Sequence, residues 1–446
     1  MQRDFLYFNF FILVVMLVFS CTHQEKSWTL KQLTSRENIN YDLDNNLNFS
    51  PDNQWVCYDT RPPSGIGETR SIERVNIISG EIKTIYEAPQ ADKIRPGVGA
   101  VSYFPNADRV VFIHGFPNLP YEKYRRFGAI VDIPADKMIV ADARDVTFPY
   151  TKGALRGGTH RHEPGGFKGE WLGFTYNDMI MQNLGKDLRT IGVTRLNMPV
   201  TVDKDENGEN QSGTGFSVLV VRVTDNPKAG SDEISHAASD SWVGGEQGYR
   251  KPDGSRQMAR AFIGKLADGK DEVFIVDIPQ DITKQSEWGP LEGTETSFPM
   301  PPEGTVQRRL THTESGCGGT VRSAPDGKWI SFLSSDPSGK RQIFIISPNG
   351  GDPIQVTSFK NGISAAPYWH FSGKYFVFPD DKGIYIVTAD PDNPEFKQFF
   401  KIPVKFDATP SNVLWSNDGK YIGFNLGNQE SKQIYVITTD SMFWKK

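Results

Sequence analysis

A turn followed by an apolar strand recurs along the whole chain. In each copy Pro, Asp, Asn or Gly forms the turn, and an aromatic residue and an apolar strand follow. Two weaker copies lie at 104–113 and near Phe216. Together with the clean copies, they predict seven units of about 45–60 residues. The clean copies are 50–59 (SPDNQWVCYD), 166–175 (GFKGEWLGFT), 324–333 (APDGKWISFL), 371–380 (FSGKYFVFPD) and 416–425 (SNDGKYIGFN).

Further strands follow the first one in each clean unit. In the fifth unit, the strand at Trp329–Ser334 is followed by strand patterns at Gln342–Ser347 and Pro353–Thr357. Strands and turns at this period are typical of propeller blades, which bury their faces by stacking in a ring. The pattern therefore predicts an all-β, seven-bladed β-propeller over residues 30–446. Two packed β-sandwiches are the alternative architecture.

Three segments outside the regular pattern carry predictions of their own. The segment LKQLTS (30–35) is similar to the strands that end other units, so we expect it to complete the last blade and close the ring. An insertion at 226–257 in blade 4 contains Gly230–Glu233, which offers an N-cap and an acidic first turn. Apolar residues at helical spacing up to Trp242 then predict one short helix. A second long loop, 284–305, is a candidate binding loop.

The first residues predict export. An apolar run, Phe5–Ser20, follows Arg3 and is shorter than the ~20 residues of a spanning helix. It ends at Cys21 and resembles a bacterial lipoprotein signal, which implies removal of residues 1–20, lipidation of Cys21 and a linker at 21–29. A plain signal peptide or an anchor helix is the alternative. The expected location is the bacterial cell envelope, as an outer-membrane lipoprotein facing the periplasm or the surface.

Composition and charge exclude several classes of protein. With 37% hydrophobic and 12% aromatic residues, the chain is too apolar to be disordered. Its 49 basic and 54 acidic residues give a net charge of −5. The chain therefore has no excess positive charge that would attract the phosphate backbone of a nucleic acid. It has no GxSxG, P-loop or dinucleotide-binding motif. Beyond Cys21, Cys57 and Cys317 are the only cysteines, and Cys57 lies in an apolar strand pattern typical of a buried free thiol.

The repeat resembles that of TolB-like propellers. More specifically, the chain resembles an uncharacterised bacterial family of seven-bladed TolB-like lipoproteins over roughly 30–440, which implies the fold and no settled activity. A looser relative, oligogalacturonate lyase, uses a metal held by histidines, and that comparison is an analogy of fold. The resembling stretches are GETRSIERVNIISGE (67–81), VFIHG (111–115), LRGGTHRH (155–162), FTYND (174–178), GSDEI (230–234), WVGG (242–245), ARAFIG (259–264), FIVDIPQD (274–281), GTET (293–296) and VQRRLT (306–311).

Histidines offer a candidate metal site. His160 and His162 precede Trp171, where we expect an innermost strand to begin, and residues i and i+2 of a strand share a face. His370 precedes the equivalent strand of the sixth unit, and His114 ends the strand of the second. If these side chains converge in the channel, they could bind a divalent ion such as manganese, zinc or calcium. Scattered histidines with ordinary hydrogen bonds are the alternative.

Arginines in or beside the family-like stretches are candidate ligands for an anion. A guanidinium binds a carboxylate through two parallel hydrogen bonds, so a local basic pocket would suit a uronate. Arginines that tie blades together are the alternative. Tyr176, Asp178 and Arg189 are candidate catalytic groups for proton transfer or charge neutralisation. The candidate anion ligands are Arg126, Arg156, Arg309 and Arg322.

A short acidic segment is similar to part of a calcium loop. Residues 203–208 (DKDENG) match its first six positions, but Thr214 stands where a bidentate Glu is needed. A solvated hairpin is the favoured interpretation.

Three functions remain open on the sequence. The preferred one is an envelope propeller, expected to be monomeric, that binds an anionic oligosaccharide in or over its channel. The first alternative is a metal-dependent lyase acting on uronate oligosaccharides, with His160, His162 and His370 around the ion. The second is a scaffold that binds an envelope protein. Contact with the membrane is expected through the lipid anchor only.

Overall fold

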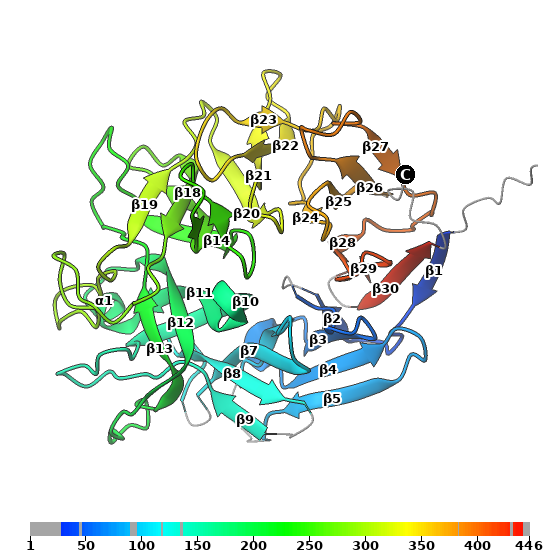
Figure 1. Cartoon of the computed structure of the whole chain (residues 1–446). Coiled ribbons are helices and arrows are strands. Elements are labelled where there is room, and N and C mark those ends of the chain that lie inside the picture. The colour runs from blue at the N-terminus through cyan, green and yellow to red at the C-terminus, as the bar shows by residue number, and fades with distance from the viewer. Residues whose placement is uncertain are drawn as a thin grey trace, which may run out of the picture.

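Seven antiparallel, four-stranded sheets form a ring around a common centre (Figure 1). The computed structural model describes residues 28–43, 47–89, 96–116, 119–133, 137–381, 383–428 and 431–439. The predicted signal (1–20), Cys21 and the linker up to residue 27 lie outside the described residues. The part that is described contains no helix long and apolar enough to cross a membrane. The predicted seven-bladed, all-β propeller is confirmed.

The first strand of each blade lies nearest the centre of the ring (Figure 1). Blade 1 consists of β2 (Asn40–Asp42), β3 (Trp55–Arg61), β4 (Ser71–Asn76) and β5 (Ile82–Glu87). Blade 2 consists of β6 (Gly99–Tyr103), β7 (Arg109–Gly115), β8 (Arg126–Asp132) and β9 (Lys137–Val140). Blade 3 consists of β10 (Gly157–Gly165), β11 (Trp171–Asp178), β12 (Arg189–Val200) and β13 (Gly213–Leu219). Blade 4 consists of β14 (His236–Trp242), β17 (Ala259–Lys265), β18 (Asp271–Asp277) and β19 (Val306–Arg309).

The last three blades follow the same order. Blade 5 consists of β20 (Cys317–Ser323), β21 (Ile330–Ser335), β22 (Arg341–Ile346) and β23 (Ile354–Gln355). Blade 6 consists of β24 (Tyr368–Trp369), β25 (Tyr375–Asp380), β26 (Gly383–Thr388) and β27 (Phe399–Lys401). Blade 7 consists of β28 (Ser411–Trp415), β29 (Tyr421–Gly427), β30 (Lys432–Thr439) and, at its outer edge, β1 (Trp28–Gln32).

The N-terminal strand closes the ring. β1 pairs antiparallel with β30, with Leu30 opposite Ile437 and Gln32 opposite Tyr435. The pairing covers an edge of β30 that would otherwise expose its backbone groups. The prediction that the segment at 30–35 completes the last blade is therefore confirmed, with the strand itself at 28–32.

The prediction of a short helix in the insertion of blade 4 is wrong. Residues 236–242 form β14, the innermost strand of blade 4, and a small hairpin of β15 (Tyr249–Arg250) and β16 (Arg256–Gln257) follows. A bulge between Ala238 and Ser241 shifts the alternation of the strand. Buried Ile234, Ala237 and Trp242 therefore fall at positions i, i+3 and i+8, a spacing that imitates a helix. The described helices are α1 (Met179–Asn183) and two 3-10 turns, η1 (Ile66–Glu68) and η2 (Phe167–Gly169).

The aromatic strand of the repeat is the second strand of its blade. We expected the innermost strand of blade 3 to begin at Trp171, but Trp171 begins β11, and the innermost strand is β10 upstream. The repeated turn joins the innermost strand to the second one. His160 and His162 consequently lie on the innermost strand itself.

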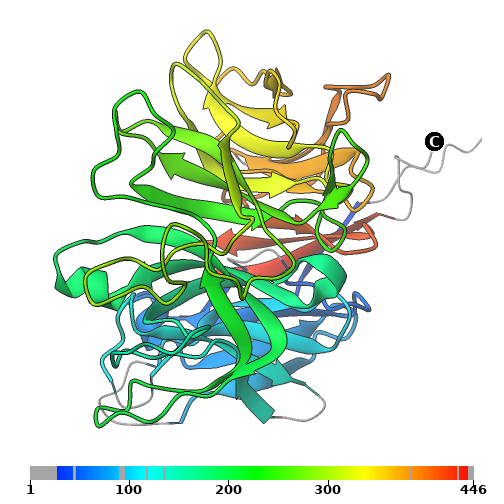
Figure 2. The same cartoon turned by 60° about the vertical axis from the view of Figure 1, so that its left-hand side comes forward.

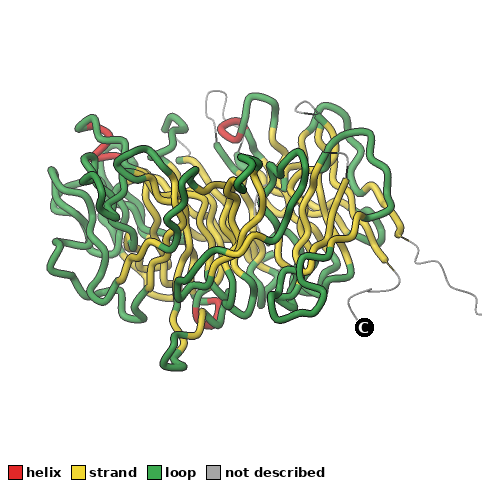
Figure 3. The backbone as a smooth tube through the Cα atoms, turned by 90° about the horizontal axis from the view of Figure 1, so that it is seen from above, coloured by secondary structure: helices red, strands yellow, loops and turns green. Residues whose placement is uncertain are grey.

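Apolar side chains fill the spaces between neighbouring blades. One cluster joins blades 4 and 5 through Ala261, Val273, Val321 and Phe332, all without exposed surface. Seen along its edge, the ring is a layer of strands with loops on both faces (Figure 3). The packed layer provides the rigid frame on which the innermost strands present their polar residues.

Candidate anion-binding site in the channel

A β-bulge interrupts five of the described innermost strands. In β10 the register with β11 shifts between His160 and Glu163, and Arg161 has a φ of 55°. A non-glycine residue in this left-handed region costs roughly 1 kcal/mol or more, and bulges often re-aim side chains beside binding sites. The recurrence of the bulge around the channel indicates that it shapes the channel wall. The left-handed residues at the bulges are Ala100, Arg161, Ser239, Gly319 and Asn412.

The bulge gives the two neighbouring histidines different surroundings. The ring of His162 is fully buried, 6.0 Å from the ring of Phe174, with its Nε2 3.6 Å from Oδ1 of Asp142. The His160 side chain remains partly exposed and lies among arginines. The expected arrangement of two imidazoles on one face of a regular strand is therefore not formed.

His160 is surrounded by positive charge. Burial lowers the pKa of its imidazole well below the ordinary value, and the charges of Arg126, Arg189 and Arg161 lower it further. Its Nδ1 is buried and has no hydrogen-bond partner among the described residues. The ring is consequently neutral at pH 7, and the charge of the site comes from the arginines.

Arg126 and Arg189 lie in this site without a carboxylate at ion-pair distance among the described residues. The Cζ of Arg126 stacks 5.1 Å from the ring centroid of Tyr121. Arg189 donates to neutral acceptors, Oγ1 of Thr175 at 2.7 Å and Oδ1 of Asn177 at 3.2 Å. Burial lowers the pKa of both guanidinium groups; for Arg189 the charge of Asp240 raises the pKa and that of Arg126 lowers it, so that burial is only partly offset. Both charges are therefore held in an environment that favours an additional anion.

Two buried carboxylates nearby, those of Glu163 and Asp240, form ion pairs with Arg260. This fully buried arginine on β17 donates Nε to Oδ2 of Asp240 at 2.8 Å, and its Nη2 lies 3.0 Å from Oε2 of Glu163. Its Cζ also lies 4.8 Å from the ring centroid of Trp242. Arg161, at the bulge, donates to the backbone oxygen of Asp240 at 2.7 Å. Asp240 and Glu163 thus make side-chain contacts with Arg260, while, against the larger effect of burial, the charge of Asp240 also raises the pKa of Arg189 and that of Glu163 raises the pKa of Arg322.

Arg322 and Tyr368 line two cavities. The Cζ of Arg322 lies 5.2 Å from the ring centroid of Tyr368. Burial, together with the charge of Arg161, lowers the pKa of Arg322 to about 10, and burial raises the pKa of Tyr368 to about 12. A cavity of about 550 Å³ is lined by this pair and by Thr320 and Ser411, and a cavity of about 230 Å³ is lined by the same pair and by Trp242 and Trp369. The first is within the size range of ligand sites.

Two of the four predicted anion ligands belong to other contacts. Arg156, almost fully buried, lies 2.9 Å from Asp178 and donates to the backbone oxygen of Ser297 at 2.6 Å. Gly293, at a φ of 71°, lets the loop backbone come close to this guanidinium. Arg309 lies on β19, 3.2 Å from Glu272. Of the other two predicted ligands, Arg322 lies on the innermost strand β20, and Arg126 begins β8 and acts through its charge on His160.

The predicted catalytic candidates Tyr176 and Asp178 lie next to each other inside blade 3. The hydroxyl of Tyr176 donates to Oδ2 of Asp178 at 3.0 Å, and Asp178 also caps α1 by accepting from the Met181 amide at 2.8 Å. Burial, with the charge of Asp178, raises the pKa of Tyr176 well above its ordinary value. These contacts stabilise the local fold. Arg189, the third candidate, lies beside His160.

His114 and His370 each have neighbours of their own. Nε2 of His114 lies 2.9 Å from the hydroxyl of Tyr86, and Nδ1 of His370 accepts from Oγ of Ser372 at 2.8 Å. Burial lowers the pKa of His114, and it lowers that of His370 to about 4. Within the described ranges, no group of three or more His, Cys, Asp or Glu side chains is arranged to hold a metal ion. The histidines predicted to hold manganese, zinc or calcium therefore do not fit a shared ion.

The remaining motifs have ordinary structural roles. In the segment 203–208, Asp205 accepts from the backbone amides of Asn207 at 3.1 Å and Asn210 at 2.6 Å, as expected for a hairpin turn. Cys57 and Cys317 are both free, which confirms the buried free thiol predicted for Cys57. Burial raises the pKa of Cys57 and raises that of Cys317 to about 12.

The sequence does not point to Arg260 or Tyr368, or to Arg161 as a member of the group around His160. Arg161 stands between His160 and His162, and that pair of histidines indicates a metal site rather than an anion site. Its left-handed backbone arises from the pairing of β10 and β11, which carries no local sequence signal. Arg260 lies in the family-like stretch ARAFIG, but its partners come from β10 and β14.

Comparison with known proteins gives a family and a fold. The profile of a family described as a protein of unknown function (DUF3748) matches residues 97–210. The chain is 38% identical over 436 residues to the uncharacterized protein YidR of Escherichia coli (strain K12), covering 92% of this chain and 97% of that protein. The predicted membership of a propeller family without a settled activity is thereby confirmed.

Two solved structures share the fold. An oligogalacturonate lyase in complex with manganese matches with a TM-score of 0.58 and 14% identity, over 95% of this chain and 96% of that chain. An oligogalacturonate lyase from Vibrio parahaemolyticus matches with a TM-score of 0.51 and 11% identity, over 93% and 96% of the two chains. At these identities the comparison establishes the fold and carries no residue roles.

Proposed function

This chain belongs to the family of Escherichia coli YidR, and we propose that its propeller binds an anionic oligosaccharide in the central channel. The main observation behind this proposal is a group of four arginines in a chain whose net charge is −5. We call the group the arginine cluster; its members are Arg126, Arg161, Arg189 and Arg322. A carboxylate of the ligand would bind between Arg126 and Arg189 beside His160. Arg322 and Tyr368 would contact the next part of the ligand at the wall of the larger cavity.

Three properties of the cluster support an anion. Burial lowers the pKa values of Arg126, Arg189 and Arg322, so a bound negative charge would offset the repulsion among them. The neutral His160 leaves its buried Nδ1 for a hydrogen bond to a ligand. The guanidinium groups are suited to paired hydrogen bonds with carboxylates, each worth about 1.5–3 kcal/mol.

A saccharide is the favoured class of anion. Tyr368, Trp242 and Trp369 line the smaller cavity beside Arg322, and aromatic faces in a polar site suit the apolar faces of sugar rings. The oligogalacturonate lyases that share the fold act on a uronate oligosaccharide according to their name. That likeness makes oligogalacturonate the first ligand to test.

The proposal stops at binding. The lyase considered from the sequence would need an ion held by the predicted histidines, and the described side chains form no such set. We therefore derive no catalytic step. The proposal includes the cell envelope as the location, as an outer-membrane lipoprotein, because residues 1–20 resemble an export signal that ends at the predicted lipidation site Cys21.

Titration calorimetry with trigalacturonic acid tests the proposal. We expect binding that weakens about tenfold or more in each of Arg126→Ala and Arg189→Ala, and that weakens with added salt. Maltotriose, which carries no charge, is the ligand control. Arg109→Ala is the matched variant, because Arg109 lies in blade 2 and forms a partly exposed ion pair with Asp132.

Two outcomes would overturn the proposal. One is equal binding of trigalacturonic acid by the cluster variants and the native protein. The other is no binding by the native protein, which would favour the scaffold alternative. The same mixtures are assayed for an unsaturated product with and without manganese. Formation of that product would show that the protein is a lyase and not only a binding protein.

A further inference from the structure

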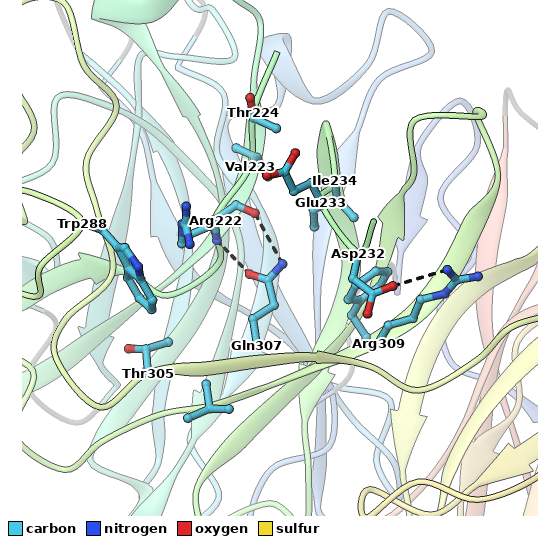
Figure 4. A pocket seen from close by; sticks show the side chains of 12 residues that line it. Arg222, Val223, Thr224, Asp232, Glu233, Ile234, Trp288, Thr305, Gln307 and Arg309 are labelled. Carbon is cyan, nitrogen blue, oxygen red and sulfur yellow. Dashed lines mark hydrogen bonds and ion pairs between the residues drawn. The ribbon is translucent and has the colours of Figure 1, made fainter. Parts of the chain in front are cut away.

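We propose that the outer edge of blade 4 carries a second saccharide-binding site, built around Trp288. The site is a cavity of about 510 Å³, called here the blade-4 pocket, and it lies between the segments that follow β13 and precede β14 and β19 (Figure 4). Blades 3 and 4 come forward in Figure 2, where their long connections lie at the front. The inference goes beyond the proposed function, because none of its residues belongs to the arginine cluster.

The aromatic part of the pocket is held in place. Trp288 belongs to the long loop 284–305, and 37% of its surface is exposed although the residue is large and apolar. The Cζ of Arg222 stacks 4.7 Å from its ring centroid. The backbone amide of Arg222 donates to Oε1 of Gln307 at 2.9 Å, which ties the segment after β13 to β19. An exposed indole fixed in this way is a platform on which a sugar ring can stack.

The polar part of the pocket is fixed as well. Arg309 donates from Nε to the backbone oxygen of Thr311 at 2.7 Å and lies 3.2 Å from Glu272. It also lies 3.4 Å from Oδ1 of Asp232, whose side chain is largely exposed. Planar acceptors and donors positioned before binding are suited to neighbouring hydroxyl groups of a sugar, because little side-chain entropy remains to be lost.

A buried hydroxyl in the wall indicates that a ligand completes the pocket. Thr305 is 6% exposed, and its Oγ1 has no hydrogen-bond partner among the described residues. Thr305 lines the pocket below Trp288 (Figure 4). A buried hydroxyl without a partner costs about 1–3 kcal/mol, which a ligand hydroxyl would recover.

A sugar suits this combination better than a small anion. Arg309 is already offset by Glu272 and Asp232, and Glu233 adds a further carboxylate to the wall. Positive and negative side chains are therefore balanced in the pocket. It offers one aromatic face and a ring of mixed donors and acceptors, which is the chemistry of hydroxyl-rich ligands.

Binding to protein that carries Arg126→Ala and Arg189→Ala together tests the inference, because this background removes the proposed channel site. Trigalacturonic acid and cellotriose are the probes, measured by titration calorimetry on the full chain. We expect residual binding of at least one probe that weakens about tenfold in Trp288→Ala and up to about tenfold in Thr305→Val. Phe399→Ala, which removes another exposed aromatic side chain, should bind as the background does.

The outcomes distinguish the two sites. If the background protein binds neither probe, or if Trp288→Ala and Thr305→Val both bind as tightly as the background, the blade-4 pocket is no saccharide site. If Trp288→Ala weakens binding in the native protein while Arg126→Ala and Arg189→Ala do not, the inference stands and the proposed function fails. Thr305→Val keeps the shape of the side chain, so it separates a lost ligand contact from a displaced loop.

Discussion

Replacing Arg156 by methionine should destabilise the propeller far more than replacing a surface arginine. The Arg156 and Asp178 side chains are 1% and 0% exposed, and Arg156 also anchors the backbone of the loop at Ser297. Arg156→Met keeps most of the volume but leaves a buried carboxylate without its cation. Breaking a buried pair in this way costs about 3–5 kcal/mol.

The expected shift in melting temperature follows from the size of the chain. Unfolding entropy of about 2.1 cal/mol/K per residue gives roughly 0.85 kcal/mol/K for a ring of about 400 residues, so the loss corresponds to about 4–6 °C. Differential scanning calorimetry at neutral pH measures it. Arg109→Met is the control, because its exposed pair with Asp132 is worth about 0–1 kcal/mol.

A double variant tests whether the loss of stability comes from the buried Asp178 carboxylate that is left without its cation. In Arg156→Met/Asp178→Asn the uncompensated charge is removed while an oxygen remains to cap α1, so part of the loss should be recovered. A melting temperature of Arg156→Met within about 1 °C of the native protein would refute the structural role of this pair. It would also return Arg156 to the candidate anion ligands.

Three further predictions concern ring closure, pH and thiols. A chain that starts after β1, at residue 33, should melt lower and form aggregates by size-exclusion chromatography, because the edge of β30 is exposed, whereas a chain starting at residue 28 should not. The pKa of His370 is about 4 in the folded protein against about 6.5 in the unfolded chain, so the folded state binds the proton less readily. The free energy of unfolding should therefore be highest above about pH 6.5 and fall by about 2 kcal/mol at pH 5. His370→Gln should remove this fall, as measured by urea unfolding between about pH 5 and 7. Cys57 is fully buried, which raises its pKa, whereas Cys317 is half-buried. A chain starting at residue 22 should therefore show at most one reactive thiol, Cys317, to a thiol reagent at pH 8 before denaturation, and rapid labelling of two thiols in the native protein would contradict the burial of Cys57.

The blades could be predicted from the sequence because their signal is local. The turn residues, and the aromatic residues that begin β3, β11 and β29, determine a turn and a strand within a few positions of themselves. The same signals recur in each unit of the repeat. The closing strand β1 was predicted for the same reason, by its likeness to other outer strands. The prediction failed in β14, where the bulge at Ser239 makes the apolar positions imitate a helix.

The candidate site was only partly predictable, because its residues meet across blades. Arg126 begins β8 in blade 2 and reaches His160 in blade 3, and no spacing in the sequence encodes that approach. The sequence offers Arg156 and Arg322 equally as candidate anion ligands. The contact with Asp178 separates Arg156 from the channel, and that contact depends on the register of β10 and β11.

A crystal structure of the protein with trigalacturonic acid tests the central claim most directly. The account predicts a ligand carboxylate about 3 Å from the guanidinium nitrogens of Arg126 or Arg189, with the chain continuing toward Arg322 and Tyr368. A channel without ligand at saturating trigalacturonic acid, or a ligand bound only away from these arginines, would contradict it.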